Sequence, residues 1–328
     1  MKKFTLYVLA ALLSLNLQSC EESKGLAGKP GDVLIVMNSE DWKSTLGEIV
    51  RETMKEDYPM LPQCEARFKL SNVSHSSFSD MFQDYRNIVV FETNSKYSSK
   101  VSYKTGVWTP GQCVINVRAG SFFEAVELYE QNAAQIIAHI ENVERERIIK
   151  NNEEYTTPEL RHEVSKVFGG SPAFPSDAKM FKQTDDFMWI SIYNTDFVKK
   201  YILMYKYPVE NAAKAMEAES IISHNKAVMN ENMPGMQENS FMTHSTFYPP
   251  TVEMIEYNGR EIAEIRGLWD VENDYMGGPF VGHEFLSADG KEMIGVTGFV
   301  YAPKYDKLPY IREVEAIVYS FNFLGHEK

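Results

Sequence analysis

The segment 266–280 combines residue types with which proteins bind ligands. It reads RGLWDVENDYMGGPF, a mixture of carboxylates, large aromatics and a Gly-Gly-Pro turn. Aromatic side chains bury much area at low entropic cost, and glycines let a backbone approach a partner closely. A small-molecule or protein ligand is therefore expected to contact these residues: Trp269, Asp270, Asp274, Gly277 and Gly278. The competing interpretation is a bulged crossover that joins two hairpins and packs Trp269 and Phe280 into the core.

The carboxylates of this segment allow two kinds of chemistry. Asp270, Glu272 and Asp274 alternate as the first three ligands of a calcium loop do, but the glycine and the final glutamate of that loop are missing. We therefore expect no metal. The same side chains, together with Glu284, could form the acid–base pair of a hydrolase if two of them lie about 5–10 Å apart.

Other catalytic and cofactor templates are missing. The chain has no Gly-x-Ser-x-Gly, Gly-x-x-x-x-Gly-Lys, Gly-x-Gly-x-x-Gly or His-Glu-x-x-His motif, and its histidines are scattered. Methionines are frequent between Met229 and Met242, but without Cys or His at ligand spacing they favour a loop with adaptable apolar contacts over a copper site. No cofactor is expected.

Two cysteines remain after the N-terminal region, Cys64 and Cys113. In an oxidising compartment they could form a disulfide, worth roughly 4 kcal/mol for a loop of about 50 residues. Two separate buried thiols are the equal alternative, because sequence spacing does not show whether the side chains meet.

The N-terminus carries the features of a secretory signal. Lys2 and Lys3 precede an apolar stretch, 4–17, that is shorter than the about 20 residues needed to span a bilayer. It ends in Leu-Gln-Ser-Cys, which resembles the lipobox of bacterial lipoproteins. The resemblance implies that residues 1–19 are removed and that Cys20 receives acyl chains such as palmitate, which anchor the protein in a membrane.

Residues 20–30 form a short tether rich in Gly. The acidic pair Glu21-Glu22 behind the cysteine resembles the export tag of Bacteroidetes surface lipoproteins. We therefore expect a protein of the cell envelope, lipid-anchored to the outer membrane on its periplasmic or surface face.

Composition describes a folded, acidic protein. The chain is 44% hydrophobic and 24% charged, with a net charge of −13 and no basic cluster. A negative surface repels polyanions, which argues against nucleic acid as a partner.

The pattern of apolar residues predicts an N-terminal α/β domain over 31–170. Val33 to Val36 and Ile88 to Phe91 are continuous apolar runs, typical of strands buried on both faces, with helices between them. Ser121 and Glu124 have capping-box spacing at the start of a long helix that we expect to reach about Asn151. We favour a helix that lies across its own sheet over a coiled-coil partner.

A Pro- and Ser-bearing linker at 171–176 predicts the start of a second domain over 177–324. Hairpins are expected around Asn258-Gly259 and around 288–290, followed by a terminal helix. The result is an α+β fold: a βαβ-rich first half closed by a long helix, then an antiparallel sheet packed by helices. The second half resembles the PsbP and Mog1 type of sandwich in the order of its elements.

Several motifs together resemble one family. They are the opening Gly-Asp-Val-Leu-Ile-Val at 31–36, the long helix after Ser121, Arg-Gly-Leu-Trp at 266–269 and Met-Gly-Gly-Pro-Phe at 276–280. Over nearly the whole mature chain the sequence resembles the Bacteroidetes envelope lipoproteins of domain-of-unknown-function family 4837. The resemblance implies no catalytic residues. We expect a non-enzymatic binding or scaffold module; the alternative is a hydrolase of envelope or dietary polymers.

Overall fold

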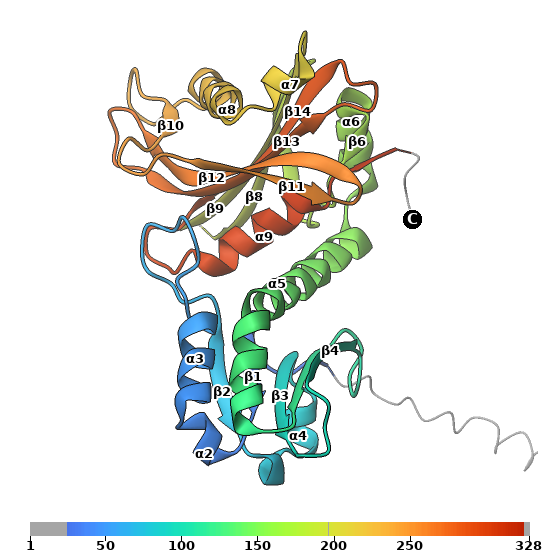
Figure 1. Cartoon of the computed structure of the whole chain (residues 1–328). Coiled ribbons are helices and arrows are strands. Elements are labelled where there is room, and N and C mark those ends of the chain that lie inside the picture. Colours follow the sequence, from blue (N-terminus) through green and yellow to red (C-terminus); the bar gives the residue numbers. More distant parts are fainter. Residues whose placement is uncertain (1–24, 196, 325–328) are drawn as a thin grey trace, which may run out of the picture.

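The computed structural model describes residues 25–195 and 197–324, which form two large sheets, each with its own core, and a small two-stranded sheet (Figure 1). The predicted signal peptide, Cys20 and the start of the predicted tether lie outside the described residues. The architecture is α+β, as predicted.

The first sheet has five strands in the order β2-β1-β3-β5-β4. The strands are β1 (Asp32–Val36), β2 (Lys69–Val73), β3 (Asn87–Thr93), β4 (Lys100–Thr105) and β5 (Cys113–Ala119). All pairs are parallel except β4 with β5. The loop 106–112 joins β4 to β5, and Gly106 and Gly111 adopt positive φ within it.

Both faces of this sheet are covered. Val33 and Ile35 pack under α3 (Thr45–Met54) and α5 (Phe122–Tyr155), whereas Leu34 and Val36 pack with side chains around α4 (Asp80–Gln83). This two-sided burial explains the continuous apolar run of β1. Two shorter elements, α2 (Ser39–Trp42) and the 3-10 turn η2 (His75–Ser77), follow β1 and β2.

Helix α5 is the longest element of the described chain. The Ser121 side chain accepts a hydrogen bond from the Glu124 amide, so the predicted capping box is confirmed. The N-terminal part of α5 buries Tyr129 and Ile136 against the first sheet, also as predicted. Its 34 residues, about 51 Å at 1.5 Å per residue, carry it beyond that sheet, where Ile149 packs against the second core.

The next helix, α6 (Pro158–Phe168), belongs to the second core. Its buried side chains, Leu160, Val164 and Phe168, join the cluster under the larger sheet. The two cores therefore divide just before Pro158, earlier than the expected linker at 171–176, because the apolar face of α6 is buried on the C-terminal side.

The second sheet is antiparallel, in the order β10-β12-β13-β14-β9-β8-β7, with β11 added to β12. Its strands are β7 (Ala178–Gln183), β8 (Phe187–Thr195), β9 (Val198–Pro208), β10 (Met242–His244), β11 (Thr251–Tyr257), β12 (Arg260–Val271), β13 (Gly277–Leu286) and β14 (Glu292–Tyr301). Asn258 and Gly259 both have positive φ, which confirms the predicted tight turn.

Helices cover both faces of this sheet. On β9, Ile202 points to the cluster with α9 (Leu308–Tyr319), and Leu203 points to the cluster with α8 (Ala218–Asn232). The short helix α7 (Ala212–Ala215) precedes α8. Strands β6 (Gly170–Ser171) and β15 (Asn322–Phe323) pair beside α6.

The two later cysteines are free in the structure, so the disulfide that the sequence left open is not formed. Cys64 is exposed in the loop after α3, and Cys113 is buried at the start of β5. Burial raises the pKa of the Cys113 thiol to about 12.

Candidate functional site

A groove of about 1370 Å³ lies between the two cores. One wall is the C-terminal part of α5, and the other is formed by the β11–β12 and β13–β14 turns together with the segment 319–323. Thr105, Gly111 and Arg161 complete the lining. The groove therefore depends on how the two halves of the chain are held together.

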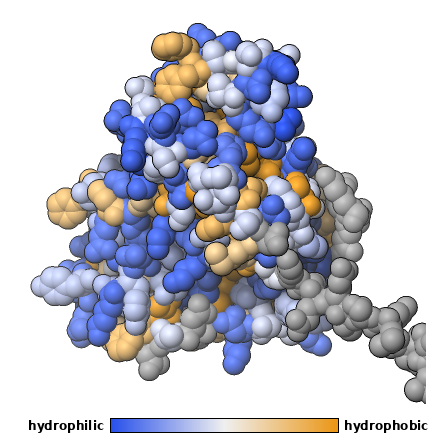
Figure 2. All heavy atoms as spheres, turned by 90° about the horizontal axis from the view of Figure 1, so that it is seen from below, coloured by the Kyte–Doolittle hydropathy of each residue, from blue (hydrophilic) through white to orange (hydrophobic). Residues whose placement is uncertain are grey.

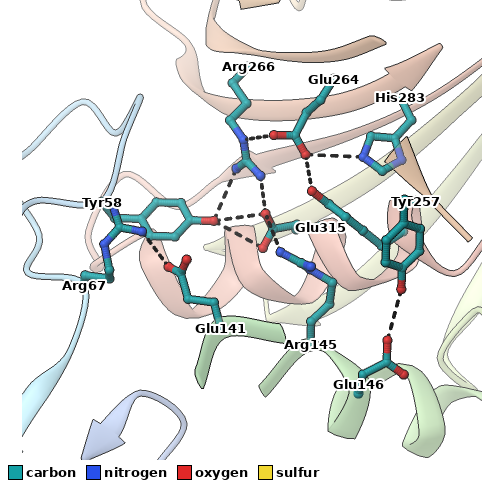
Figure 3. Close-up of polar contacts among 11 residues, drawn as sticks. Tyr58, Arg67, Glu141, Arg145, Glu146, Tyr257, Glu264, Arg266, His283 and Glu315 are labelled. Carbon is teal, nitrogen blue, oxygen red and sulfur yellow. Dashed lines mark hydrogen bonds and ion pairs between the residues drawn. The ribbon is translucent and has the colours of Figure 1, made fainter. Parts of the chain in front are cut away.

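A buried cluster of charged residues joins the halves beside this groove (Figure 3). Arg266 of β12 donates from Nε to Glu264 at 2.7 Å and from Nη2 to Glu315 of α9. Its Nη1 donates to the Tyr58 hydroxyl at 3.2 Å, and that hydroxyl donates to Glu315 at 3.2 Å. Because Tyr58 belongs to the first half, Arg266 connects both halves with one guanidinium.

Glu264 is held ionised by its neighbours. Burial alone would raise its pKa, but hydrogen bonds from His283 and Arg266 hold the pKa of Glu264 far below its usual range. Burial lowers the pKa of His283, so the neutral ring donates from Nε2 to Glu264 at 3.3 Å. The hydroxyl of Tyr319 donates to the same carboxylate at 2.6 Å.

Helix α5 adds a second row of contacts. The Arg145 guanidinium lies 3.7 Å from the centre of the Tyr319 ring and 3.6 Å from the Glu315 carboxylate. The next residue of α5, Glu146, accepts a hydrogen bond from Tyr257 at 3.0 Å. Tyr257 and Tyr319 also line the groove, so the charged cluster directly positions part of its wall.

A second buried cluster fixes α5 to the first sheet. Glu144 accepts two hydrogen bonds from Arg86, at 2.9 and 2.6 Å, and one from Asn87 at 2.6 Å. Arg147 lies 3.1 Å from the same carboxylate. Burial opposes ionisation, but these cations hold the pKa of Glu144 below its usual value.

A third polar cluster lies under α8. Glu284 is fully buried and accepts hydrogen bonds from the hydroxyls of Tyr205, at 2.5 Å, and Tyr207, at 2.9 Å. Burial without a cationic partner raises the pKa of Glu284 to about 7. Asn225 of α8 donates to the Tyr205 hydroxyl at 3.0 Å, and its Oδ1 accepts a hydrogen bond from His244 Nε2 at 2.9 Å. Glu284 has no exposed surface, and the cluster holds α8 on the sheet through Asn225.

The ligand residues predicted in 266–280 are only partly brought together. Trp269 is 3% exposed and its indole nitrogen donates to the Val300 carbonyl, so this side chain packs in the core and lines no surface. Gly278 is required there because a Cβ would lie 2.1 Å from the same carbonyl oxygen. The crossover is a short turn between β12 and β13, and the core-packing interpretation of Trp269 and Phe280 is confirmed.

The remaining predicted residues line a smaller hollow of about 460 Å³. Asp270, Glu272, Asp274 and Gly277 contribute to it, beside the exposed ring of Tyr275. Ligand binding at this hollow stays a prediction.

The predicted hydrolase pairs that include Glu284 are wrong. Asp270 pairs with Gly277, and Glu284 lies seven residues farther along β13. At about 3.3 Å per residue the separation is roughly 23 Å, too long for a glycosidase pair.

Sequence reasoning missed the charged cluster. Glu264 and Arg266 did carry one signal, since they are two charged residues inside a strand whose neighbours are apolar and which must be buried on both faces. Glu315, Arg145 and Tyr58 carried none. Among residues 25–195 and 197–324, no group of three or more His, Cys, Asp or Glu side chains is arranged to hold a metal ion.

Fold and groove define a class: an α+β protein of two cores joined by one continuous helix, with a groove between them. The chain belongs to the family described as a domain of unknown function (DUF4837), whose model matches residues 157–320, half of the chain. Residues 27–153 match a second domain of unknown function (DUF8532). The expected family is thus found over the second half, and the first half matches a different one.

No curated protein matches the chain. A crystal structure from Bacteroides thetaiotaomicron VPI-5482 aligns with a TM-score of 0.27 and 8% identity, over 49% of this chain and 47% of that one. The chain therefore spans about half the length of that structure. The human StarD13 (DLC2) lipid transfer and protein localization domain aligns with a TM-score of 0.23 and 12% identity, over 51% and 96%.

Replacing Arg266 by methionine should destabilise the protein by about 3–5 kcal/mol, because Glu264 and Glu315 then stay buried without their cation. Urea unfolding measures the change. The matched control is Arg118→Met, which breaks a more exposed pair with Glu92 and should cost about 1 kcal/mol or less. Equal losses in the two variants would contradict the importance of the buried cluster.

Glu284 should make stability depend on pH. Its folded pKa of about 7 lies above the unfolded value, so the native state retains a proton that the unfolded state releases, and stability falls as pH rises from about 4.5 to 7. Glu284→Gln mimics the protonated acid, so its free energy of unfolding should not fall over this range. The difference in stability between the variant and the wild type should therefore increase by a few kcal/mol, at about 1.4 kcal/mol per pKa unit.

Urea unfolding at pH 5, 6, 7 and 8 tests this dependence. Glu253→Gln, an exposed change on β11, serves as the control and should follow the wild type at every pH. A Glu284→Gln curve parallel to the wild type would refute the assignment.

Proposed function

We propose that this protein is a lipid-anchored protein of the bacterial cell envelope that binds a ligand in the groove between its two cores. It acts as a binding or scaffold module and carries out no chemistry on the ligand. The observation that carries the proposal is the groove itself, about 1370 Å³ and lined by separate segments of both halves. Typical small-ligand pockets measure about 300–1000 Å³, so an extended ligand suits it.

The buried clusters favour binding over catalysis. A general acid or base must reach the substrate within hydrogen-bond distance. Glu264, Glu284 and Glu315, the glutamates with the most altered surroundings, are all buried and bonded to protein side chains. Their arrangement stabilises walls and leaves none of them free to act on a ligand.

The groove is also distinct from ordinary surface. The face seen from below in Figure 2 is mostly hydrophilic, with apolar side chains in separate small groups, as is usual for a surface in water. The groove instead gathers aromatic, aliphatic and charged side chains around one hollow: Tyr257, Leu286, Tyr319 and Phe323, together with Arg260 and Lys150.

The anchor is proposed from the sequence alone. Leu17-Gln18-Ser19-Cys20 supplies the lipidation site, and 20–30 supplies the tether. No helix in the described part of the chain is long and apolar enough to cross a membrane. Glu21 and Glu22 favour the outer membrane and its surface face, and the net charge of −13 favours a partner other than nucleic acid.

Filling the groove should abolish ligand binding without unfolding the protein. Ala288 is exposed at the groove edge in the β13–β14 turn, so Ala288→Trp adds bulk there at little cost to the core. Lys291→Trp adds the same bulk to the same turn outside the lining. Native mass spectrometry of ligands that copurify with the full chain should show loss in the first variant only. Equal retention in both would refute the groove as the binding site.

Cys20→Ala should prevent lipidation, because the thiol is the acyl acceptor at the cleavage site. Detergent phase partitioning of the expressed protein should move the variant to the aqueous phase and leave the wild type with the detergent. Identical partitioning would contradict the anchor, whatever the groove binds.

A further inference from the structure

Arg260 occupies an unusual place in the groove. It is the first residue of β12, opposite Tyr257 across the Asn258-Gly259 turn, and both residues line the hollow. The tight turn fixes the backbone on either side, so the Arg260 side chain starts from a well-defined position at the groove wall.

The guanidinium of Arg260 is surrounded by aromatic rings. Its central carbon lies 4.9 Å from the ring centre of Phe285, 5.5 Å from that of Phe321 and 5.4 Å from that of Phe323. Nη2 donates to the Phe321 carbonyl at 2.5 Å, and Nη1 is buried with no acceptor in the described part of the chain. Ring faces attract a cation, but they do not neutralise it.

The arginines of the two buried charged clusters have carboxylate partners. Arg86 is 2.6 Å from Glu144, and Arg266 lies between Glu264 and Glu315. Among the described residues, no carboxylate lies within ion-pair distance of Arg260. A half-buried cation without a counter-ion costs free energy, and an anion that enters the groove would recover that cost.

The remaining lining has the same sign. Four basic side chains line the groove, Arg147, Lys150, Arg161 and Arg260, against two acidic ones, Glu146 and Glu153. Lys150 is exposed and forms no ion pair in the described part of the chain. Arg147 is already paired with Glu144, so Arg260 and Lys150 attract an anion to the groove in a protein whose net charge is −13.

We propose that the groove binds an amphiphilic anion, with its carboxylate or phosphate paired to Arg260 and its apolar part against Tyr257, Leu286, Tyr319 and Phe323. The inference rests on the proposed function, since it names the ligand class of the same groove. Lys150 on the opposite wall adds long-range attraction for the same charge.

Three short probes test the inference: butanoate, butanamide and butyl phosphate, which differ in charge and are too short to partition strongly into micelles. NMR titration of the full chain in non-ionic detergent gives their dissociation constants. Both anions should bind at least tenfold more tightly than the amide, and the tighter of the two identifies the natural anionic group. Equal affinity for butanoate and butanamide, or no binding of either anion, would overturn the inference.

Variants assign the effect to Arg260. Arg260→Met keeps an apolar stem among the rings and should weaken anion binding at least tenfold, whereas Arg260→Lys keeps the charge and should lose less. Arg51→Met is the matched control, because Arg51 also lies over an aromatic ring, Trp42, and donates to a carbonyl, but in the first core. An equal loss in Arg51→Met would refute the role of Arg260.

The probes also separate this inference from the function on which it rests. If the neutral amide binds as well as the anions and Ala288→Trp removes all of them, the groove binds ligands and only the charge assignment fails. If Ala288→Trp leaves the binding of every probe unchanged, the groove is not the site and both proposals fail.

Discussion

The structure depends on one guanidinium, that of Arg266, placed between Glu264 and Glu315 where little water reaches. Removing three charges from water is costly, and the cost is recovered only when geometry is good and every remaining polar atom has a partner. Tyr58, His283, Tyr319 and Arg145 supply those partners from four different segments. The constraint therefore fixes the large sheet, α9 and the first half of the chain relative to one another.

Local patterns were enough to predict most elements. The apolar runs of β1 and β3 indicate a sheet covered on both faces. Ser121 and Glu124 indicate the start of α5, and Asn258-Gly259 indicates a turn in which both residues have positive φ. In each case the determining interaction lies within a few residues of chain. Such interactions leave a signal that can be read without knowing what lies opposite in space.

The site could not be predicted in the same way. Arg266 contacts Tyr58, 208 residues away in the sequence, and Glu315, 49 residues away. The residues next to each of the three give no indication of these contacts. The prediction of a ligand site at 266–280 failed in part for a related reason. The Trp269 indole donates to the Val300 carbonyl, 31 residues away, and Gly278 is a glycine because a Cβ would collide with the same carbonyl. Aromatic and glycine residues look alike in sequence whether they contact a ligand or a neighbouring strand.

Helix α5 has a consequence for kinetics. It runs unbroken from the first core to the second, and α6 begins only three residues after it ends, so α5 itself contains no hinge between the two cores. If the groove binds a ligand as proposed, its walls are then already formed when the ligand arrives, because no hinge within α5 closes the two cores around it. Association is then governed by diffusion and electrostatic steering, and residence time by how well the preformed walls fit the occupant.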